Sequence, residues 1–538
     1  MWKPWPSLSP EKPGTPSGGC LLVGGGIRRI GSRLLCRRDD LKPVNTPPTN
    51  SEPLPALDPG WDWAAPDRAE LERVLPRFLK RQRWFGSKDR PLLSARIVGH
   101  ASVQERWWWF RVRVDQEPGE YLIALGYDSG ELGHRILRES PEAVLGVSPT
   151  DSGASAGEGV LFDALWDDAF GCAVLELAAS EKQTGDSAQL RARACSGAEI
   201  QAWRTLPPKR MGVEQSNSAV VYGHRGILKF FRKAQNGGLR EAEFLRHLRG
   251  IQPRVPACYG TLEWAGGVAA LFVEFRENQG DAWQRALAGL HEMAGDDSGQ
   301  VLERETRLGR LLGRRTGEMH RALAEDTGDN FGREPMDAGW RCAAVEAMER
   351  TSLGVRGRLV DWLKTADSPE GAAVQEGWET LLGRVRELKN RAFDGVRIQV
   401  HGDYHLGQVL WTGADFVLID FEGEPGRPVE ERWEKRPALV DVAGMLRSFD
   451  YAARVAEDNR ATGPDAARRW RSAVSAAFWE GYLAEVAGTG LVPKEEGEAT
   501  ELLRVFLVEK AVYELGYELM YRPQMASVPL GALRDFLG

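Results

Sequence analysis

The sequence lacks the features that mark membrane-spanning, disulfide-bonded or nucleic-acid-binding proteins. It has six cysteines, without a CxxC pair or a zinc-type spacing, as expected for reduced thiols in the cytoplasm. No run of about 18 apolar residues occurs, which excludes a membrane-spanning helix. The 70 Lys and Arg residues against 77 Asp and Glu give a net charge of -7, which argues against a nucleic-acid partner. We therefore expect a cytoplasmic globular protein with small-molecule ligands.

Changes in composition along the chain predict a tail followed by three folded parts of an α+β protein. Residues 1–58 are rich in Pro, Gly and Ser, and they bury too little apolar surface to offset the chain entropy, so we expect a flexible tail. Residues 59–147 begin with helical spacing and continue with alternating strand patterns, which indicates a small α+β module. Residues 148–277 are predicted to be rich in strands, and residues 278–538 carry long amphipathic helical patterns.

The stretch VHGDYHLGQVLW and the following FVLIDFEGEP combine charged and amide side chains with short apolar runs. Apolar runs on both sides of TGAD predict a β-hairpin. If Trp411 pairs near Phe416, then Gln408 and Asp420 lie within roughly 5–8 Å of each other at Cβ. A carboxylate and an amide oxygen suit a Mg²⁺ ion that carries ATP phosphates. Asp403, on the loop before the hairpin, is then placed to accept the proton of an attacking hydroxyl.

Upstream segments supply the other parts that a kinase requires. EQSNSAVVYGHRGILKFF reads as strand, turn and strand with Lys229 on the return strand, and the helix LREAEFLRHL offers Glu241 and Glu243 as carboxylates. VAALFVEFRENQGDAW gives an apolar strand that ends near Glu274, a hinge at which the adenine of ATP would pair with the backbone. The predicted ATP phosphate loop comprises Gln215, Ser216, Asn217 and Ser218.

Each of these residues has an ordinary structural explanation when it is taken alone. A Lys on a strand usually lies at a solvent-exposed edge of the sheet, and a Glu on a helix usually lies on the solvent-exposed face of the helix. Their order favours a function, because phosphate loop, lysine, acid, hinge, HGD loop and DFE follow one another as a kinase demands.

The sequence resembles the maltokinase family, which shares the aminoglycoside-phosphotransferase branch of the bilobal protein-kinase-like fold. The resemblance is carried by RQRWFGSK, EQSNSAVVY, NQGDAW, LGRRTGEMHRALA, HGDYHLGQVL, IDFEGEPGRP, DVAGMLRSFDYAA and VEKAVYELGYEL. It implies ATP-dependent, Mg²⁺-assisted phosphorylation of maltose at its anomeric hydroxyl, which would feed α-glucan and glycogen synthesis. Residues 59–147 would then form an extra N-terminal cap module ahead of the two kinase lobes.

The same resemblance implies roles for individual residues. Asp403 would be the catalytic base, and Lys229 would position the α- and β-phosphates with Glu243 as its partner. Asp441 would brace the catalytic loop and cap its own helix. The implied magnesium ligands are Gln408, Asp420 and Glu422.

A sugar site needs several fixed polar groups and a rigid aromatic surface. Tyrosines recur every four residues from Tyr513 to Tyr521 and share one helix face, for which core or interface packing is the ordinary explanation. As sugar contacts we expect Tyr517, His401 and Arg447.

Three alternatives remain open at this point. HGDYH could be a metal-ligand cluster, because alternate residues share a face of an extended strand, but a metallophosphatase also needs GNHE and GDxxDR motifs, which are absent. A kinase-like binding module without chemistry is disfavoured by the intact Asp403 and Lys229. A related kinase of the same fold that phosphorylates glucosamine or another sugar would differ from a maltokinase in the shape of its substrate pocket. A single sequence does not reveal that shape. His405 is expected to brace the loop, and a monomer and a dimer are equally compatible with the sequence.

Overall fold

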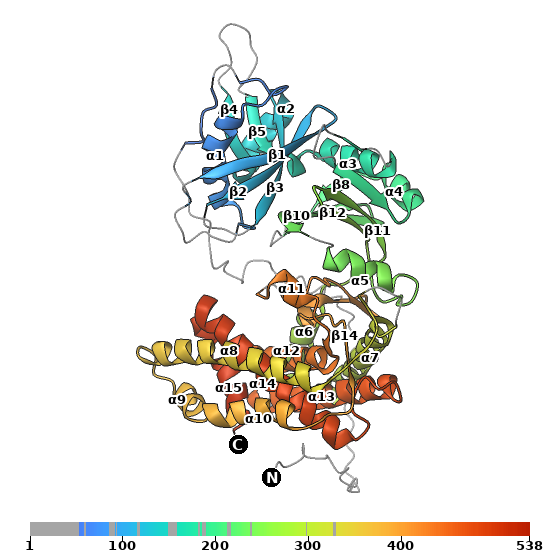
Figure 1. Cartoon of the computed structure of the whole chain (residues 1–538), viewed down its shortest axis with the longest axis vertical. Helices are drawn as coiled ribbons and strands as arrows, with labels where there is room; N and C mark the ends of the chain where they lie inside the picture. Colours follow the sequence, from blue (N-terminus) through green and yellow to red (C-terminus); the bar gives the residue numbers. More distant parts are fainter. Residues whose placement is uncertain are drawn as a thin grey trace, which may run out of the picture. The chain divides into compact units, whose positions relative to one another are not determined.

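The computed structural model describes the chain from residue 53 onward with short gaps. The described residues are 53–58, 61–85, 92, 94–115, 119–148, 159–180, 183–184, 190–211, 217–236, 239–296, 298–325, 330–424 and 426–537. The predicted tail, residues 1–58, lies almost entirely outside them. The residues from Pro55 onward belong to one compact unit that combines a sheet with many helices, as predicted for an α+β protein (Figure 1).

The cap module is an antiparallel sheet with two helices. Its elements are α1 (Arg68–Arg81), β1 (Ala95–Val103), β2 (Trp107–Val114), β3 (Glu120–Asp128), α2 (Glu131–Glu139), β4 (Val144–Ser148) and β5 (Gly159–Asp163). Helix α1 begins where the Asp67 side chain accepts the Ala69 N–H, and its apolar stripe, including Leu71 and Leu75, is buried in the core of this module. Because β5 pairs with β3 and β4, the predicted boundary at residue 147 divides strands that pair with each other.

Strand β2 joins two hydrophobic cores. Trp107 and Trp109 are buried in a core shared with Phe170 and Phe230, whereas Trp108 packs on the opposite face against the core that contains α1. Successive side chains of a strand point to opposite faces, so one run of tryptophans stabilises both layers. These indoles therefore hold the cap module to the strand-rich part of the chain.

The strand-rich part continues the same sheet. Its elements are α3 (Asp168–Ser180), β6 (Gln183–Thr184), β7 (Leu190–Ala194), α4 (Gly197–Trp203), β8 (Pro208–Arg210), β9 (Asn217–Tyr222), β10 (Gly226–Asn236), α5 (Arg240–Leu248), β11 (Cys258–Trp264) and β12 (Gly267–Glu274). The main path of the sheet runs β1-β2-β3-β10-β12-β11-β7-β6, and β9 also pairs with β10 and β8. Lys229 on β10 lies opposite Ala219 on β9, which confirms the predicted strand, turn and return strand.

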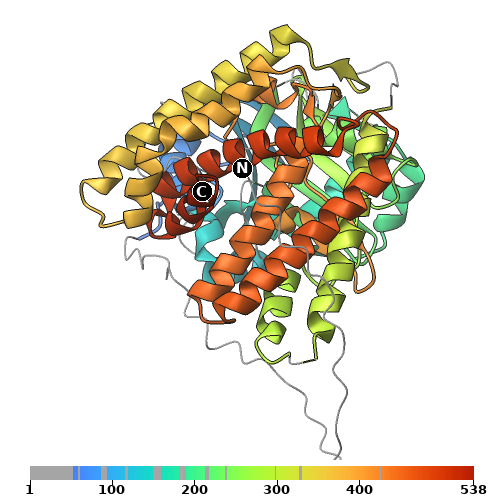
Figure 2. The ribbon, with the colours of Figure 1, turned by 90° about the horizontal axis from the view of Figure 1, so that it is seen from below.

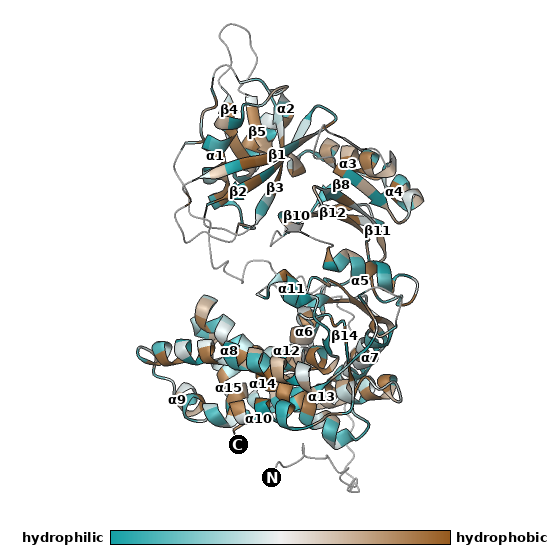
Figure 3. Cartoon of the chain, viewed as in Figure 1, coloured by the Kyte–Doolittle hydropathy of each residue, from teal (hydrophilic) through white to brown (hydrophobic). Residues whose placement is uncertain are grey.

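The remainder of the chain is mostly helical. Its elements are α6 (Ala282–Met293), α7 (Gln300–Leu323), β13 (Glu334–Pro335), α8 (Ala338–Leu363), α9 (Pro369–Glu376), α10 (Trp378–Asn390), β14 (Val396–Ile398), β15 (Val409–Trp411), β16 (Phe416–Leu418), α11 (Val429–Arg432), β17 (Arg436–Pro437), α12 (Leu439–Asp458), α13 (Pro464–Val486), α14 (Glu496–Tyr521) and α15 (Ser527–Asp535). Many of these helices carry both polar and apolar residues (Figure 3), as expected for elements with one buried face. Within the described residues, no helix is long and apolar enough to cross a membrane.

Helices α7 and α13 pack side by side at very short range (Figure 2). A Cβ atom at Gly313 of α7 would lie 2.0 Å from the Phe478 carbonyl oxygen, and one at Gly481 of α13 would lie 2.3 Å from the Arg310 carbonyl oxygen. Glycine is required at both positions because any side chain would push the helices apart. This packing fixes His320 of α7, whose imidazole reaches the catalytic loop through Asp441.

Candidate active site

The HGDYHLGQ loop ends in the hairpin that the sequence predicts. Trp411 pairs with Phe416 and Val409 with Leu418, so the register matches the prediction. The Gln408 amide Nε2 donates to Asp420 Oδ2 at 2.9 Å, which places the two predicted metal ligands in direct contact. Asp420 has a φ of 69°, an unusual backbone conformation for a residue other than glycine. Such a conformation persists only where the surroundings hold it, here by the hairpin and by ion pairing.

Asp441 braces the loop, as predicted, but the prediction that it also caps its own helix is wrong, because α12 begins after Ala438 without a side-chain cap. Its carboxylate accepts the N–H groups of His401 at 2.7 Å and Gly402 at 2.9 Å, and its Oδ2 lies 3.0 Å from His320 Nε2. Burial alone would raise the pKa of Asp441, but the hydrogen bond from His320 and the neighbouring charges hold it below its usual value. The carboxylate therefore stays ionised and fixes the two backbone groups just before Asp403.

The structure corrects the prediction that His401 contacts a sugar. Its side chain is fully buried, its Nε2 donates to the Ile419 carbonyl at 2.9 Å, and its Nδ1 accepts the Asp403 N–H at 3.4 Å. Burial lowers the pKa of His401, which keeps the ring neutral. The ring joins the loop to Ile419, just after β16, so its role is structural. His405, which was expected to brace the loop, accepts the Gly407 N–H at 3.0 Å.

Arg240 performs a bracing role that the sequence analysis missed. Its guanidinium donates to the carbonyls of Phe421 at 2.6 Å and His401 at 3.1 Å, and also to the Val400 carbonyl. Burial lowers the pKa of Arg240 to about 9. A buried cation held by backbone carbonyls ties the HGD loop, the DFE segment and α5 together. No spacing rule predicts this contact, because the partners are main-chain atoms far away in sequence.

Four charged side chains form what we call the Lys229 cluster. Lys229 Nζ lies 2.8 Å from Glu241, 3.0 Å from Asp420 and 2.5 Å from Glu422. The partner of Lys229 on α5 is therefore Glu241, and the prediction of Glu243 is wrong. Residues two positions apart on a helix point in different directions, and Glu243 instead lines a separate cavity described below.

The charges of the Lys229 cluster perturb one another strongly. Although burial would lower it, the pKa of Lys229 is held well above its usual value by Asp420, Glu241 and Glu422. Burial raises the pKa of Glu241 to about 7 despite the ammonium beside it. Burial also opposes ionisation of Asp420, but Lys229 lowers the pKa of this carboxyl below its ordinary range.

Carboxylates of the Lys229 cluster suit a divalent cation. Oxygens of Glu241, Asp420 and Glu422 all lie within 4.8 Å of one another, close enough to share one ion. Hard oxygen donors of this kind are what Mg²⁺ prefers. Gln408 contributes an amide to the same place, because its Nε2 already bonds Asp420.

The predicted phosphate-loop residues have different surroundings. Gln215 and Ser216 lie outside the described residues. Asn217 Nδ2 donates to Glu422 Oε1 at 3.0 Å, so this side chain adjoins the Lys229 cluster. Ser218 is fully buried and its hydroxyl accepts from Arg232 Nε at 2.8 Å. The prediction that the Ser218 hydroxyl meets a phosphate is therefore wrong, since it points into the protein.

Glu274 ends β12, where the sequence predicts a hinge. Its carboxylate accepts the Ala257 N–H at 3.1 Å and pairs with Arg276 at 3.0 Å. The Glu274 carboxylate thus already has partners within the protein. Any nucleotide contact at this residue would come from the backbone, which is the form in which the sequence predicts it.

Asp403 has a cationic neighbour that the sequence analysis did not identify. Lys510 Nζ on α14 lies 3.7 Å from Asp403 Oδ1 and 3.0 Å from Glu424 Oε1. Burial would raise the pKa of Glu424, but Lys510 and Arg427 lower it to about 2. The motif VEKAVYELGYEL marks the segment that contains Lys510, yet only the folded chain brings it to Asp403.

A cavity of about 940 Å³ opens beside Asp403; we call it the aromatic cavity. Tyr517 and Tyr521 are exposed at its wall with ring centroids 4.9 Å apart, and Tyr513 also lines it. Its other walls come from α6, α8 and α12. Aromatic faces beside polar groups are the lining that a sugar site requires. Among the predicted sugar contacts, Tyr517 is the one that the structure places in this cavity.

The structure corrects the prediction for Arg447. This side chain is buried, its Nη2 donates to Glu514 at 2.6 Å and its Nη1 donates to Asp450 at 2.6 Å. Its guanidinium is therefore occupied by a structural ion-pair network between α12 and α14. The FDYAA motif contributes Asp450 to this network, while its Tyr451 lines the aromatic cavity.

Two family models match the chain. The model of the phosphotransferase enzyme family matches residues 205–474, and that of the maltokinase N-terminal cap domain matches residues 78–167. The chain belongs to the phosphotransferase enzyme family. This family carries the predicted kinase-like fold, and the cap domain agrees with the resemblance to maltokinases.

Several relatives are similar over large parts of the chain. A glucosamine kinase of Streptacidiphilus jiangxiensis is 26% identical over 340 residues, which cover 60% of this chain and 72% of that protein. A glucosamine kinase of Mycolicibacterium smegmatis is 30% identical over 256 residues, 45% of this chain and 59% of that protein. A solved glucosamine kinase in complex with glucosamine, ADP and inorganic phosphate superposes with a TM-score of 0.60 at 21% identity, covering 86% of this chain and 97% of that one.

Proposed function

We propose that this phosphotransferase transfers the γ-phosphoryl group of ATP to the anomeric hydroxyl of maltose and releases maltose 1-phosphate and ADP. The observation that carries the proposal is the position of Asp403, which lines the aromatic cavity on a loop that continues directly into the Lys229 cluster. A base between a charged phosphate site and a sugar-sized cavity is the arrangement that phosphoryl transfer to a hydroxyl needs. The product would feed α-glucan synthesis.

In this mechanism Asp403 accepts the proton of the attacking sugar hydroxyl. Lys510 holds the carboxylate in place, while Asp441 and Arg240 fix the loop backbone, so little reorganisation is needed during the reaction. Lys229, oriented by Glu241, would exchange its contacts with Asp420 and Glu422 for the α- and β-phosphates. A backbone hinge at Glu274 would hold the adenine.

Asp420 and Glu422, with Gln408, would hold the Mg²⁺ that accompanies ATP. The ion would neutralise charge on the phosphates. The carboxylate oxygens of Asp420 and Glu422 fit such an ion because they lie within 4.8 Å of each other, and Glu241 adds a third carboxylate at the same place.

A neutral acceptor suits the charges of the aromatic cavity. Glu514 is already paired with Arg447, and Glu518 accepts from Arg522 at 2.6 Å and from the Tyr451 hydroxyl at 3.0 Å. An amino sugar would need a carboxylate for its ammonium, whereas a neutral disaccharide needs hydrogen bonds and an aromatic face. Tyr517 would supply that face. These features support maltose, as do the resemblance of DFEGEPGRP to the maltokinase family and the match to a maltokinase cap domain.

Glucosamine is the second candidate acceptor, because the similar proteins are glucosamine kinases. Asp281, in the wall of the aromatic cavity, caps α6 without an ion pair among the described residues and is the carboxylate that could receive an ammonium. The two candidates are separated by steady-state kinetics with Mg-ATP. We expect kcat/KM for maltose to exceed that for glucosamine by at least about tenfold, and the reverse order would overturn the choice of acceptor.

A further inference from the structure

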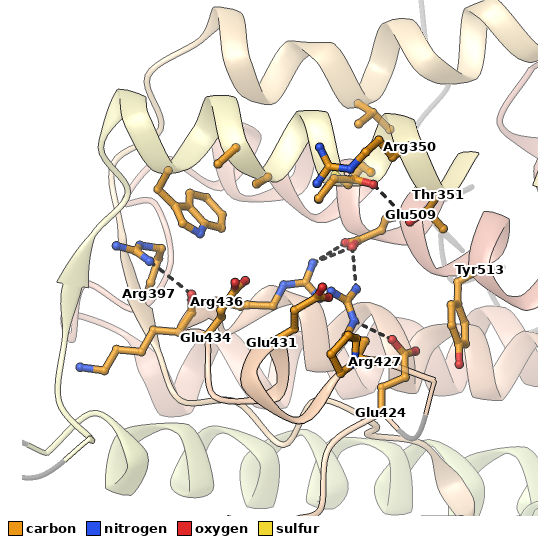
Figure 4. A pocket seen from close by; sticks show the side chains of 18 of the residues that line it. Arg350, Thr351, Arg397, Glu424, Arg427, Glu431, Glu434, Arg436, Glu509 and Tyr513 are labelled. Carbon is orange, nitrogen blue, oxygen red and sulfur yellow. Dashed lines mark hydrogen bonds and ion pairs between the residues drawn. The ribbon is translucent and has the colours of Figure 1, made fainter. Parts of the chain in front are cut away.

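A second cavity of about 1090 Å³ lies on the other side of Tyr513 (Figure 4). It is formed by α8, α10, α14 and the segment from Glu424 to Arg436, and its residues include neither Asp403 nor Lys510. It adjoins the aromatic cavity through three shared wall residues, Thr351, Gly426 and Tyr513. Its volume is slightly above the range of about 300–1,000 Å³ that is typical of ligand pockets and is similar to that of the aromatic cavity.

Most charges in the wall of the second cavity are already paired. Arg436 donates to both carboxylate oxygens of Glu509 at 2.7 Å, and Arg427 lies 2.8 Å from Glu424 and 3.3 Å from Glu509 (Figure 4). Arg397 and Lys435 both pair with Glu334. A strongly anionic ligand would have to break these pairs and leave carboxylates without partners. Glu243, Glu431 and Glu434 line the same wall and would also repel an anion. The wall therefore disfavours a strong anion, and a neutral molecule with many hydroxyl groups can bond both to these carboxylates and to the outer edges of the intact pairs.

Three further features of the second cavity fit a sugar. Two half-buried indoles, Trp340 and Trp433, line it and supply flat apolar surface. The buried Gln399 in the same wall has a side-chain oxygen with no hydrogen-bond partner among the described residues, so an acceptor is available there. Arg350 is exposed at the rim and forms no ion pair within the described part of the chain. Aromatic faces, unsatisfied acceptors and guanidinium donors together are typical of carbohydrate recognition.

We propose that the second cavity is a binding site for a neutral carbohydrate, distinct from the site at which Asp403 acts. Tyr513 forms the partition, since it lines both cavities, and its hydroxyl lies close to Gly426, which lines both as well. Glu424 touches both sides, because it bonds Arg427 in the second cavity and Lys510 beside Asp403. A sugar in the second cavity would thus lie two ion pairs away from the catalytic loop. This proposal goes beyond the proposed phosphotransfer and does not require it.

The test is fluorine NMR on protein labelled with 5-fluorotryptophan, titrated with maltotriose in the absence of nucleotide. Trp340 and Trp433 report on the second cavity and Trp283 reports on the aromatic cavity, and each resonance is assigned by a Trp→Phe variant. We expect the Trp340 and Trp433 resonances to shift along one saturable curve. Inorganic phosphate should not move them.

A cavity-filling variant and a matched control locate the site. Ala347 lines the second cavity from α8, so Ala347→Phe should abolish the shifts of Trp340 and Trp433 and leave the behaviour of the Trp283 resonance as it is in the unsubstituted protein. Glu346→Phe, at the exposed neighbouring position on the same helix, should retain all responses. If Ala347→Phe does not fold, Ala343→Phe at an exposed lining position replaces it.

The proposal is overturned if Trp340 and Trp433 do not respond to maltotriose, if they respond to phosphate alone, or if their shifts persist in the filled variants. Because the readout involves neither ATP nor turnover, it can fail while phosphotransfer succeeds, and the reverse also holds. The two proposals are therefore tested separately.

Discussion

The Lys229 cluster and the aromatic cavity are built in opposite ways. The cluster consists of four charged side chains that satisfy one another within about 3 Å, and each belongs to a short motif. The cavity is lined by aromatic side chains together with charged ones, among them Asp281, Lys510 and Glu518, from segments spread between Asp281 and Arg522. Reaction chemistry is thus fixed by a few local charges, whereas acceptor choice depends on a surface assembled from distant segments. Substitutions in the two regions should accordingly affect different kinetic constants.

Among the substitutions predicted here, removal of the proposed base Asp403 should have the largest effect on turnover. Asp403→Asn keeps the shape of the side chain but cannot accept a proton from the acceptor, so kcat should fall about 1000-fold. ATP affinity, measured by calorimetry, should stay within twofold of the wild type. Asp394→Asn, an exposed aspartate outside both regions, is the control and should retain full turnover. Near-normal kcat in Asp403→Asn would remove the base assignment.

Acid should weaken the ion pairs that Glu424 forms with Arg427 and with Lys510, the cation beside Asp403. Its pKa is about 2 in the folded protein against 4.5 for a free side chain, so it contributes stability above pH 4.5 that is lost as pH falls towards 2. The contribution is about 3 kcal/mol at neutral pH. Urea unfolding between pH 6 and pH 3 should therefore show a steeper loss of unfolding free energy in the wild type than in Glu424→Gln. Equal slopes for the two proteins would contradict the role given to Lys510 and Arg427.

The two glutamates of α5 offer a matched pair of substitutions on the phosphate side. Glu241→Gln should lower kcat/KM for ATP roughly 30-fold, because a charged hydrogen bond to Lys229 worth about 2 kcal/mol is lost. Glu243→Gln should change kcat/KM for ATP less than twofold, since that side chain lines the second cavity. The KM for the sugar should stay the same in both variants. If Glu243→Gln were the more damaging change, the assignment of the ion pair would be reversed.

The smallest effect on the kinetic constants is expected for Tyr517 in the wall of the aromatic cavity. Tyr517→Ala should raise KM for the sugar about fivefold, the equivalent of about 1 kcal/mol for one lost aromatic face. Tyr517→Phe retains the ring and should behave like the wild type. The KM for ATP should not move in either variant. An unchanged sugar KM in Tyr517→Ala would exclude this tyrosine from the acceptor site.

Local sequence patterns were sufficient for the parts of the site that are close together along the chain. The hairpin register that joins Gln408 to Asp420 followed from apolar alternation around a turn, and the strand that carries Lys229 followed from its hairpin with β9. The α+β class followed from the shift between strand and helix periods. The role of Asp441 as a brace was also predicted, but from the resemblance of its segment to the maltokinase family.

Other parts could not be predicted because they depend on packing between distant segments. Glu241 and Glu243 are equivalent in a sequence pattern, and only the angle at which α5 meets the sheet selects Glu241. His401 and Arg447 belong to functional motifs, yet burial gives both of them structural partners. The proximity of Lys510 to Asp403 spans more than 100 residues of sequence, so no spacing rule could find it.

The most direct test of the proposed phosphotransfer is phosphorus NMR of the products formed from Mg-ATP and maltose, with ADP release followed in parallel. We predict maltose-dependent release of ADP together with a phosphate signal coupled to the anomeric proton of the reducing glucose unit. A phosphate on another hydroxyl, or ADP release that does not depend on maltose, would contradict the account.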